Sequence, residues 1–317
     1  MKNPKYILIG IGVVVLILII MIVGLVAIAI VFPNNNNFLS EDNKIVVIEI
    51  DNPLMLKTEN PGMFGTREPS VKDYIDELDR AEKDKSVKGI LLKVNCPGGE
   101  VVASEKLARK VKEVSEKKPV VSYVETLGAS GAYMAIAPTY IVAEKHSIVG
   151  SIGVRMDILH YYGLMKKIGV NVSVIKAGKY KDIGSPYRPM TPEEKEYLQK
   201  MINETYDDFV KWVSENRHIP LNKTYKIADG KIYSGIDAKK VGLVDKVGTE
   251  EDAINITAKM CNITNPNLVY YSSSEPNFLL GVINRISYYM GYGIGKALIE
   301  NSDVVGKINS NLIVGYN

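Results

Sequence analysis

The longest apolar run of the chain lies at its amino terminus. Residues 6–32 carry no charged side chain, and nearly all of them are Ile, Val, Leu, Ala or Gly. A helix of about 20 such residues can cross the hydrocarbon layer of a bilayer, because it satisfies its own backbone groups there. The pattern therefore predicts a membrane anchor over residues 1–32, followed by a polar linker over residues 33–43.

A cleaved signal peptide is the alternative interpretation of this run, and Ala27-Ile28-Ala29 supplies a small-x-small pattern. Secretory apolar regions usually have roughly 7–15 residues, so the length favours an uncleaved anchor. Lys2 and Lys5 precede the run. By the positive-inside tendency, the amino terminus stays in the cytoplasm and the body lies outside. We therefore expect a single-pass protein of the cell membrane whose body is extracytoplasmic.

After the linker, short apolar runs alternate with segments of helical periodicity. Residues 44–50 (KIVVIEI) are typical of a buried strand, whereas residues 71–81 repeat their apolar side chains on one helical face behind Ser70 as N-cap. This rhythm predicts an α/β layer built from βαβ units. Further strands are expected over 89–94 and 120–124, further helices over 102–114, 128–137 and 191–217, and a strand–helix pair around 243–260.

Composition narrows the classes of function. The net charge is only +3 and the basic residues are spread along the chain, so a nucleic-acid surface is not expected. The two cysteines, Cys96 and Cys261, make no disulfide framework and are expected to be free thiols. The histidines (His146, His160 and His218) stand apart, without the spacing of metal ligands. We expect neither a metal nor a cofactor.

Two Gly-rich segments follow predicted strands. The first, 94–99 (VNCPGG), is either a plain tight turn or a set of backbone donors that stabilises an oxyanion. The second, 126–133 (TLGASGAY), places Ser130 among small residues where a strand gives way to a helix. That pattern is typical of a nucleophile elbow. It is equally typical of close packing with Ser130 as a helix cap.

A third segment, 176–182 (KAGKYKD), is a basic loop, and such a loop is usually only solvated. A serine hydrolase needs a base, however, and none of the histidines lies in a Gly-rich motif. Lysine can replace histidine where burial disfavours its charged form. One of Lys176, Lys179 and Lys181 is then the candidate base.

Taken together, these segments resemble the signal peptide peptidase A (protease IV) family of serine–lysine peptidases. The resemblance covers about residues 44–260 and implies the stacked βαβ units of the crotonase and Clp protease fold, preceded by one N-terminal transmembrane helix. It places the peptidase domain at 44–262 and leaves 263–317 as a tail of uncertain role. The matching runs are VNCPGGEV (94–101), TLGASGAY (126–133), VGSIGV (149–154), KAGKYKDIGSPYRPMTPEEK (176–195) and ADGKIYSGIDAKKVGLVD (228–245).

Carried over position by position, the resemblance implies that Ser130 is the nucleophile and Lys181 the general base. The backbone amides of Gly99 and of Gly131 or Ser130 would form the oxyanion hole. Ser151 corresponds to a serine that helps to orient the lysine. Cys96 stands where the family usually has a serine, a position that we expect to be structural.

The resemblance also implies a membrane-bound serine endopeptidase that degrades cleaved signal peptides and other unfolded hydrophobic peptides through an acyl-enzyme. Half-length members such as this chain are expected to form a homo-oligomer, an octamer by resemblance, in which neighbouring protomers help to complete each site. Three alternatives stay open. They are a serine–lysine protease dedicated to one partner such as a stomatin-like protein, an acyl-CoA hydratase or isomerase of the same fold, and a non-catalytic membrane scaffold.

Overall fold

Strands whose two faces are both apolar form the centre of the molecule. The computed structural model describes residues 43–58 and 67–271, so the predicted anchor (1–32), almost all of the linker and most of the tail lie outside the described residues. Within the described part, no helix combines the length and the apolar character needed to cross a membrane.

The sheet has eight strands in the described residues, in the order β6-β5-β3-β2-β1-β8, with β4 paired to β3 and β7 to β4. Every pairing is parallel except that of β5 with β6, so the sheet is mixed. The strands are β1 (Lys44–Ile50), β2 (Val87–Cys96), β3 (Val120–Ala129), β4 (Tyr140–Ala143), β5 (Ile148–Gly150), β6 (Ile232–Ser234), β7 (Lys246–Val247) and β8 (Asn267–Tyr271).

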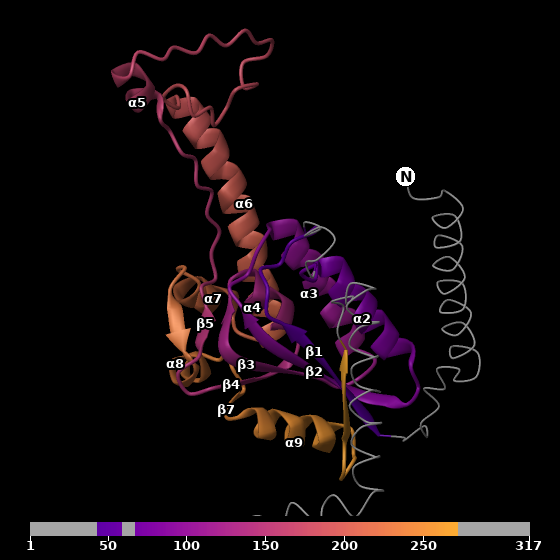
Figure 1. The fold of residues 1–317 in the computed structure, drawn as a ribbon. Coiled ribbons are helices and arrows are strands. Elements are labelled where there is room, and N and C mark those ends of the chain that lie inside the picture. Colours follow the sequence, from indigo (N-terminus) through magenta and orange to yellow (C-terminus); the bar gives the residue numbers. More distant parts are fainter. Residues whose placement is uncertain (1–42, 59–66, 272–317) are drawn as a thin grey trace, which may run out of the picture. The chain divides into compact units, whose positions relative to one another are not determined.

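Helices cover both faces of this sheet, with α2, α3 and α4 on one side and α9 on the other (Figure 1). Alternate residues of a strand point to opposite faces, so both sets must be apolar where both faces are covered. In β1, Val46 and Ile48 join the larger core cluster, whereas Ile45 and Val47 join the cluster under α9. The helices are α2 (Val71–Lys83), α3 (Val101–Ser115), α4 (Gly131–Ile136), α5 (Tyr162–Lys167), α6 (Pro192–Arg217), α7 (Leu221–Ile227), α8 (Gly235–Lys240) and α9 (Glu250–Met260).

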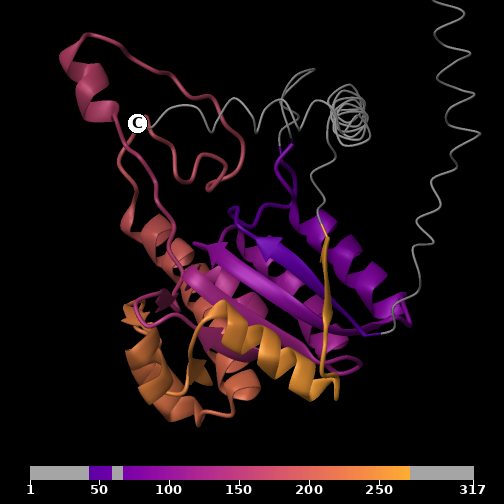
Figure 2. The same cartoon turned by 60° about the horizontal axis from the view of Figure 1, so that its bottom comes forward.

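The structure confirms the predicted α/β alternation. Ser70 caps α2 through a capping box with Asp73, and Thr191 caps α6 in the same way with Glu194. Several short elements were not predicted, namely β4, β5, β6, α5, α7 and α8. The strand β8 was not predicted either: it lies in the segment that the sequence assigns to the tail, and it pairs with β1 at the edge of the sheet (Figure 2). The narrower crotonase and Clp arrangement stays a prediction.

A long excursion separates β5 from the end of α6. We call residues 156–204 the arm; it contains α5, an irregular loop and the first half of α6 (Figure 1). The second half of α6 packs on the body, where Phe209, Val210 and Val213 are buried. The Trp212 indole N–H donates to the Met134 carbonyl oxygen in α4 at 2.9 Å. One unbroken helix therefore connects the arm to the core.

Candidate active site

The sheet brings three predicted segments to one edge. β2 and β3 run parallel with Cys96 opposite Gly128, and β5 runs parallel to β3 with Gly150 opposite Ala129. The carboxyl ends of the three strands thus lie together, which is where α/β sheets usually bind ligands. The Pro-Gly-Gly turn, Ser130 and Ser151 each follow directly after one of these ends.

Ser130 occupies the junction between β3 and α4 in a strained conformation. Its φ of 52° and ψ of −123° are sparsely populated for a residue with a side chain and cost about 1–3 kcal/mol. The surrounding backbone imposes this geometry. The Ser130 amide donates to the Gly150 carbonyl oxygen at 2.7 Å, and the Ser130 carbonyl oxygen accepts from the Met134 amide at 3.0 Å. A strained serine between strand and helix is the geometry of a nucleophile elbow.

The two glycine segments meet beside this serine. A Cβ added to Gly98 would lie 2.8 Å from the Gly131 amide nitrogen, and one added to Gly131 would lie 3.4 Å from the Gly99 amide nitrogen. Neither the Gly99 nor the Gly131 amide donates a hydrogen bond to another described residue. The Gly131 amide is at the start of α4, where the first N–H groups of a helix lack partners. The two amides are therefore available to an oxyanion.

Contacts with Leu54 hold the Pro-Gly-Gly turn in place. The Leu54 amide donates to the Gly98 carbonyl oxygen and the Glu100 amide donates to the Leu54 carbonyl oxygen, both at 2.8 Å. Gly98 has a φ of +108°, which favours glycine. A Cβ on Gly99 would come within 2.1 Å of the Leu54 carbonyl oxygen. Both glycines are thus required by the backbone that aims the amides.

The thiol of Cys96 forms hydrogen bonds that stabilise this turn. It donates to the Asn52 carbonyl oxygen at 3.0 Å and accepts from the Gly98 amide at 3.4 Å. Burial raises the pKa of the Cys96 thiol to about 11, so the group is protonated and unreactive at neutral pH. These contacts agree with the structural role that the sequence predicts.

Replacement of Cys96 by serine is therefore expected to leave peptide cleavage within about twofold of wild type, because a hydroxyl makes the same two hydrogen bonds. Incubation with iodoacetamide at pH 7 should likewise leave activity intact, as measured by residual turnover. Rapid inactivation that Cys96→Ser abolishes would contradict this account and show an accessible thiolate.

A cavity of about 820 Å³ opens over Ser130. Gly99, Gly131 and Ser151 line it as well, so four of the five predicted site residues share one cavity. None of the three histidines, all of them in the described residues, is part of its wall. Other wall residues come from the β2–α3 region, from α4, from the segment after β5, from α6 and from the loop before β6: Pro97, Val101, Ser104, Met134, Gly153, Val154, Arg155, Thr205, Tyr206, Phe209, Ala228, Asp229 and Gly230.

Lys181, the fifth predicted residue, is not in this wall. It is exposed on the arm, in the loop that precedes α6. That loop is tied to the first turn of α6 at Glu194, whereas α6 reaches the cavity only from Thr205 onward. The rise of ~1.5 Å per residue separates these two points of the helix by ~16 Å. The structure does not bring Ser130 and Lys181 of one chain together.

Two parts of the site, one from α3 and one from α6, are not predicted from the sequence. Ser104 in α3 lies against the start of α4, where its Oγ would be 2.0 Å from a Cβ on Gly131. Tyr206 and Phe209 form a wall of the cavity from α6. The amphipathic face of α6 is a signal for the second contribution, but it is indistinguishable from an ordinary core face in the sequence.

Comparison with known proteins identifies the family of the chain. Residues 112–264 match the model of peptidase family S49. A candidate protease of Methanocaldococcus jannaschii is 65% identical over 80% of this chain and 81% of its own. A candidate signal peptide peptidase SppA of Enterococcus faecium is 31% identical over 80% and 74%. A candidate protease of Synechocystis is 38% identical over 63% and 70%.

Fold, site and relatives together define a serine peptidase that acts on peptide substrates. The chain belongs to peptidase family S49, the family of signal peptide peptidase A. This membership removes the acyl-CoA enzyme and the non-catalytic scaffold from the alternatives.

Proposed function

We propose that the protein is a membrane-bound endopeptidase that degrades unstructured hydrophobic peptides, such as cleaved signal peptides, with Ser130 as nucleophile and Lys181 as base. The observation that carries this proposal is the convergence of Ser130 with the free amides of Gly99 and Gly131 in one cavity. The wall residues Val101, Met134 and Phe209 are apolar, which suits apolar side chains of a peptide. The anchor predicted over residues 1–32 would hold the enzyme near such peptides.

In the proposed mechanism, the uncharged amine of Lys181 accepts the proton of Ser130 Oγ as the oxygen attacks the peptide carbonyl carbon. The Gly99 and Gly131 amides donate to the oxyanion that forms. The lysine then transfers the proton to the leaving amine as the C–N bond breaks. The same lysine then takes a proton from a water molecule, whose oxygen attacks the carbonyl carbon of the acyl-enzyme. As the ester bond to Ser130 Oγ breaks, the lysine returns the proton to that oxygen and the carboxylic acid product leaves.

A second copy of the chain would supply the lysine. Lys181 is exposed and outside the cavity of its own chain. The arm that carries it also exposes many apolar side chains, and Ile175 is fully exposed to solvent. Val170, Val172 and Val174 are exposed at alternate positions, the spacing of one face of an extended strand. A large apolar surface of this kind marks an interface between proteins. Pairing of arms in a homo-oligomer would cover it and deliver Lys181 to a neighbouring Ser130.

A serine-reactive fluorophosphonate tests the nucleophile. We expect it to label the wild-type protein in membranes and to leave Ser130→Ala unlabelled, because Ser130 is the one serine of residues 43–58 and 67–271 that combines the elbow geometry with the two free amides. Ser115→Ala, at the end of α3 and outside the cavity, is the control, and it should still be labelled. Equal labelling of Ser130→Ala and wild type would contradict the assignment.

Substrate range is tested with the same preparation. Unstructured apolar peptides should be cleaved and folded globular proteins should remain intact. Cleavage confined to a single membrane protein would instead identify a peptidase dedicated to one partner.

A further inference from the structure

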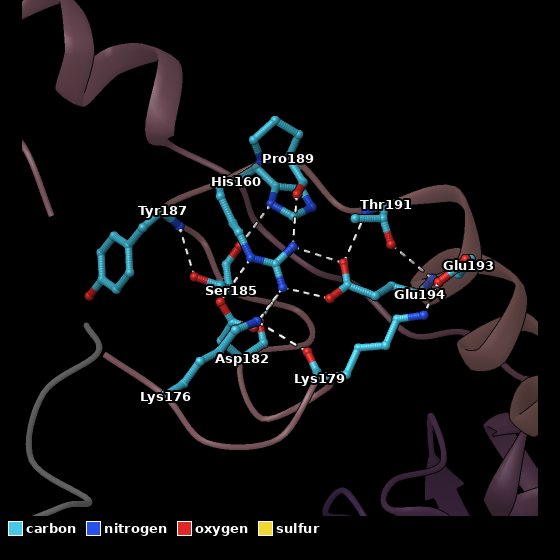
Figure 3. A network of polar contacts seen from close by, with 11 residues as sticks. His160, Lys176, Lys179, Asp182, Ser185, Tyr187, Pro189, Thr191, Glu193 and Glu194 are labelled. Atoms are coloured by element: carbon cyan, nitrogen blue, oxygen red, sulfur yellow. Dashed lines mark hydrogen bonds and ion pairs between the residues drawn. The ribbon is translucent and has the colours of Figure 1, made fainter. Parts of the chain in front are cut away.

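Arg188 is the centre of an ionic network on the arm. Figure 3 shows this network, with Asp182, Glu194 and Lys176 labelled. Its Nε and Nη2 atoms donate to the two carboxylate oxygens of Asp182, both at 2.8 Å. Its Nη1 and Nη2 atoms donate to the two oxygens of Glu194 at 2.8 and 2.5 Å. The guanidinium therefore forms a bidentate ion pair with each of two carboxylates, the strongest geometry available to arginine.

This network is better enclosed than the other ion pairs of the arm. The side chains of Arg188, Asp182 and Glu194 are 28%, 12% and 5% exposed. The neighbouring pair of Lys179 and Glu193 is 65% and 63% exposed, and exposed pairs contribute little. Lys176 adds a further ion pair to Asp182. The enclosed part of the network is thus the part centred on Arg188.

The carboxylates of the network stay charged over the working range of a peptidase. Hydrogen bonds from Arg188 and then Lys176 hold the pKa of Asp182 well below its usual range. Hydrogen bonds from Arg188 and then the Thr191 amide lower the pKa of Glu194 to about 2. Because both pKa values are lowered, the ion pairs are fully present at any pH above the ordinary pKa values of Asp and Glu. They are lost only as the pH falls through the lowered pKa values.

The network connects the loop that carries Lys181 to the first turn of α6. Asp182 follows Lys181 directly, and Arg188 Nη2 also donates to the Asp182 backbone carbonyl oxygen at 3.2 Å. Glu194 belongs to the first turn of α6, where its carboxylate accepts from the Thr191 amide at 2.9 Å in the capping box. The same helix forms the cavity wall at Thr205, Tyr206 and Phe209. The backbone beside Lys181 is therefore fixed to a rigid element.

We propose that Arg188 is a positioning residue for Lys181, holding the backbone at Asp182 against the first turn of α6 so that the amine is presented at one fixed place. This inference rests on the proposed function, since it requires Lys181 to be the base. A base must lie within hydrogen-bond reach of the proton that it accepts. A displacement of about 1 Å at such a group can lower the rate by on the order of 10²-fold.

The test compares purified, assembled variants for kcat, KM and particle mass by light scattering. Arg188→Gln should lower kcat by on the order of 10²-fold, with KM within about twofold and the assembly unchanged. Arg188→Lys should lose a similar factor, because lysine keeps the charge but not the planar fork. The double variant Arg188→Gln/Asp182→Asn should be no slower than the slower single variant, because the two residues act as one unit. Lys179→Gln is the matched control from the exposed pair and should match wild type.

Each alternative outcome has a separate meaning. The positioning role would be overturned if both Arg188 variants had the kcat of wild type. It would also be overturned if the reductions of kcat in Arg188→Gln and Asp182→Asn multiplied in the double variant. Losses of kcat in both Arg188 variants that parallel a loss of assembly would overturn it as well, since these indicate structural support alone. Lys181→Ala is measured beside them. Near-wild-type turnover of that variant would overturn both the proposed base and the positioning role. An inactive Lys181→Ala together with fully active Arg188 variants would overturn the positioning role only.

Discussion

Two inactive variants, Ser130→Ala and Lys181→Ala, are expected to recover peptide cleavage when they are co-expressed in one membrane. Each variant alone should lose essentially all turnover, because one lacks the nucleophile and the other lacks the base. The structure separates these residues within a chain, so an active site in a mixed assembly can combine the serine of one copy with the lysine of the next. With equal expression, about a quarter of the sites would contain both intact residues. Cleavage of a fluorogenic apolar peptide by the co-purified, differently tagged variants measures this.

The double variant Ser130→Ala/Lys181→Ala, co-expressed with wild type, provides the control for assembly. Failure of the two single variants to recover any activity, in assemblies shown to contain both tags, would mean that serine and lysine come from the same chain. The arm would then have to fold back toward its own cavity, away from the arrangement in Figure 1.

Gly131→Ala is expected to reduce kcat by about 10²–10³-fold, the usual effect of losing one oxyanion-hole donor. The added Cβ would lie 2.0 Å from Ser104 Oγ and 2.8 Å from Ser104 Cβ, so the start of α4 must shift and carry the Gly131 amide away from Ser130. Ser104→Gly in the same chain removes both atoms and should restore part of the rate. Steady-state kinetics on one peptide substrate measures all the variants.

Two matched variants separate this steric effect from a loss of folding. A Cβ on Gly163 meets no atom within 4 Å, so Gly163→Ala should behave as wild type. Ser104→Gly alone should lose stability by about 1 kcal/mol as a glycine within a helix, with kcat largely retained. If Gly131→Ala/Ser104→Gly were no faster than Gly131→Ala, contact with Ser104 would not be the cause.

The sequence predicts the body of the enzyme well because its signals are local. The apolar runs at 45–48 in β1 and 90–92 in β2 favour a sheet covered on both faces, and each capping box, at Ser70 and at Thr191, spans only four consecutive residues. Ser130 is recognisable because the small residues around it are what a strained strand-to-helix turn requires. The strand β8 has only five residues, and nothing local distinguishes NLVYY from an apolar stretch of tail.

The arm is where prediction from one sequence fails. Many of its apolar residues are exposed in the described part of their own chain, and a pattern in one chain does not specify what a second chain covers. Arg188 is six residues from both Asp182 and Glu194, which is not the i,i+3 or i,i+4 spacing of contacts on a helix and is too far for a contact along one strand. The basic loop therefore resembles an ordinary solvated loop until its coordinates show the network.

Because α6 runs without interruption from the Arg188 network to the cavity, the number of residues between them sets both their separation and their relative rotation. One inserted or deleted residue between Glu194 and Thr205 would turn the Lys181 loop by about 100° and shift it by ~1.5 Å along the axis. Substitutions on the solvent side of that stretch would change neither quantity. The middle of α6 should thus tolerate wide variation in composition among homologous enzymes but almost none in length.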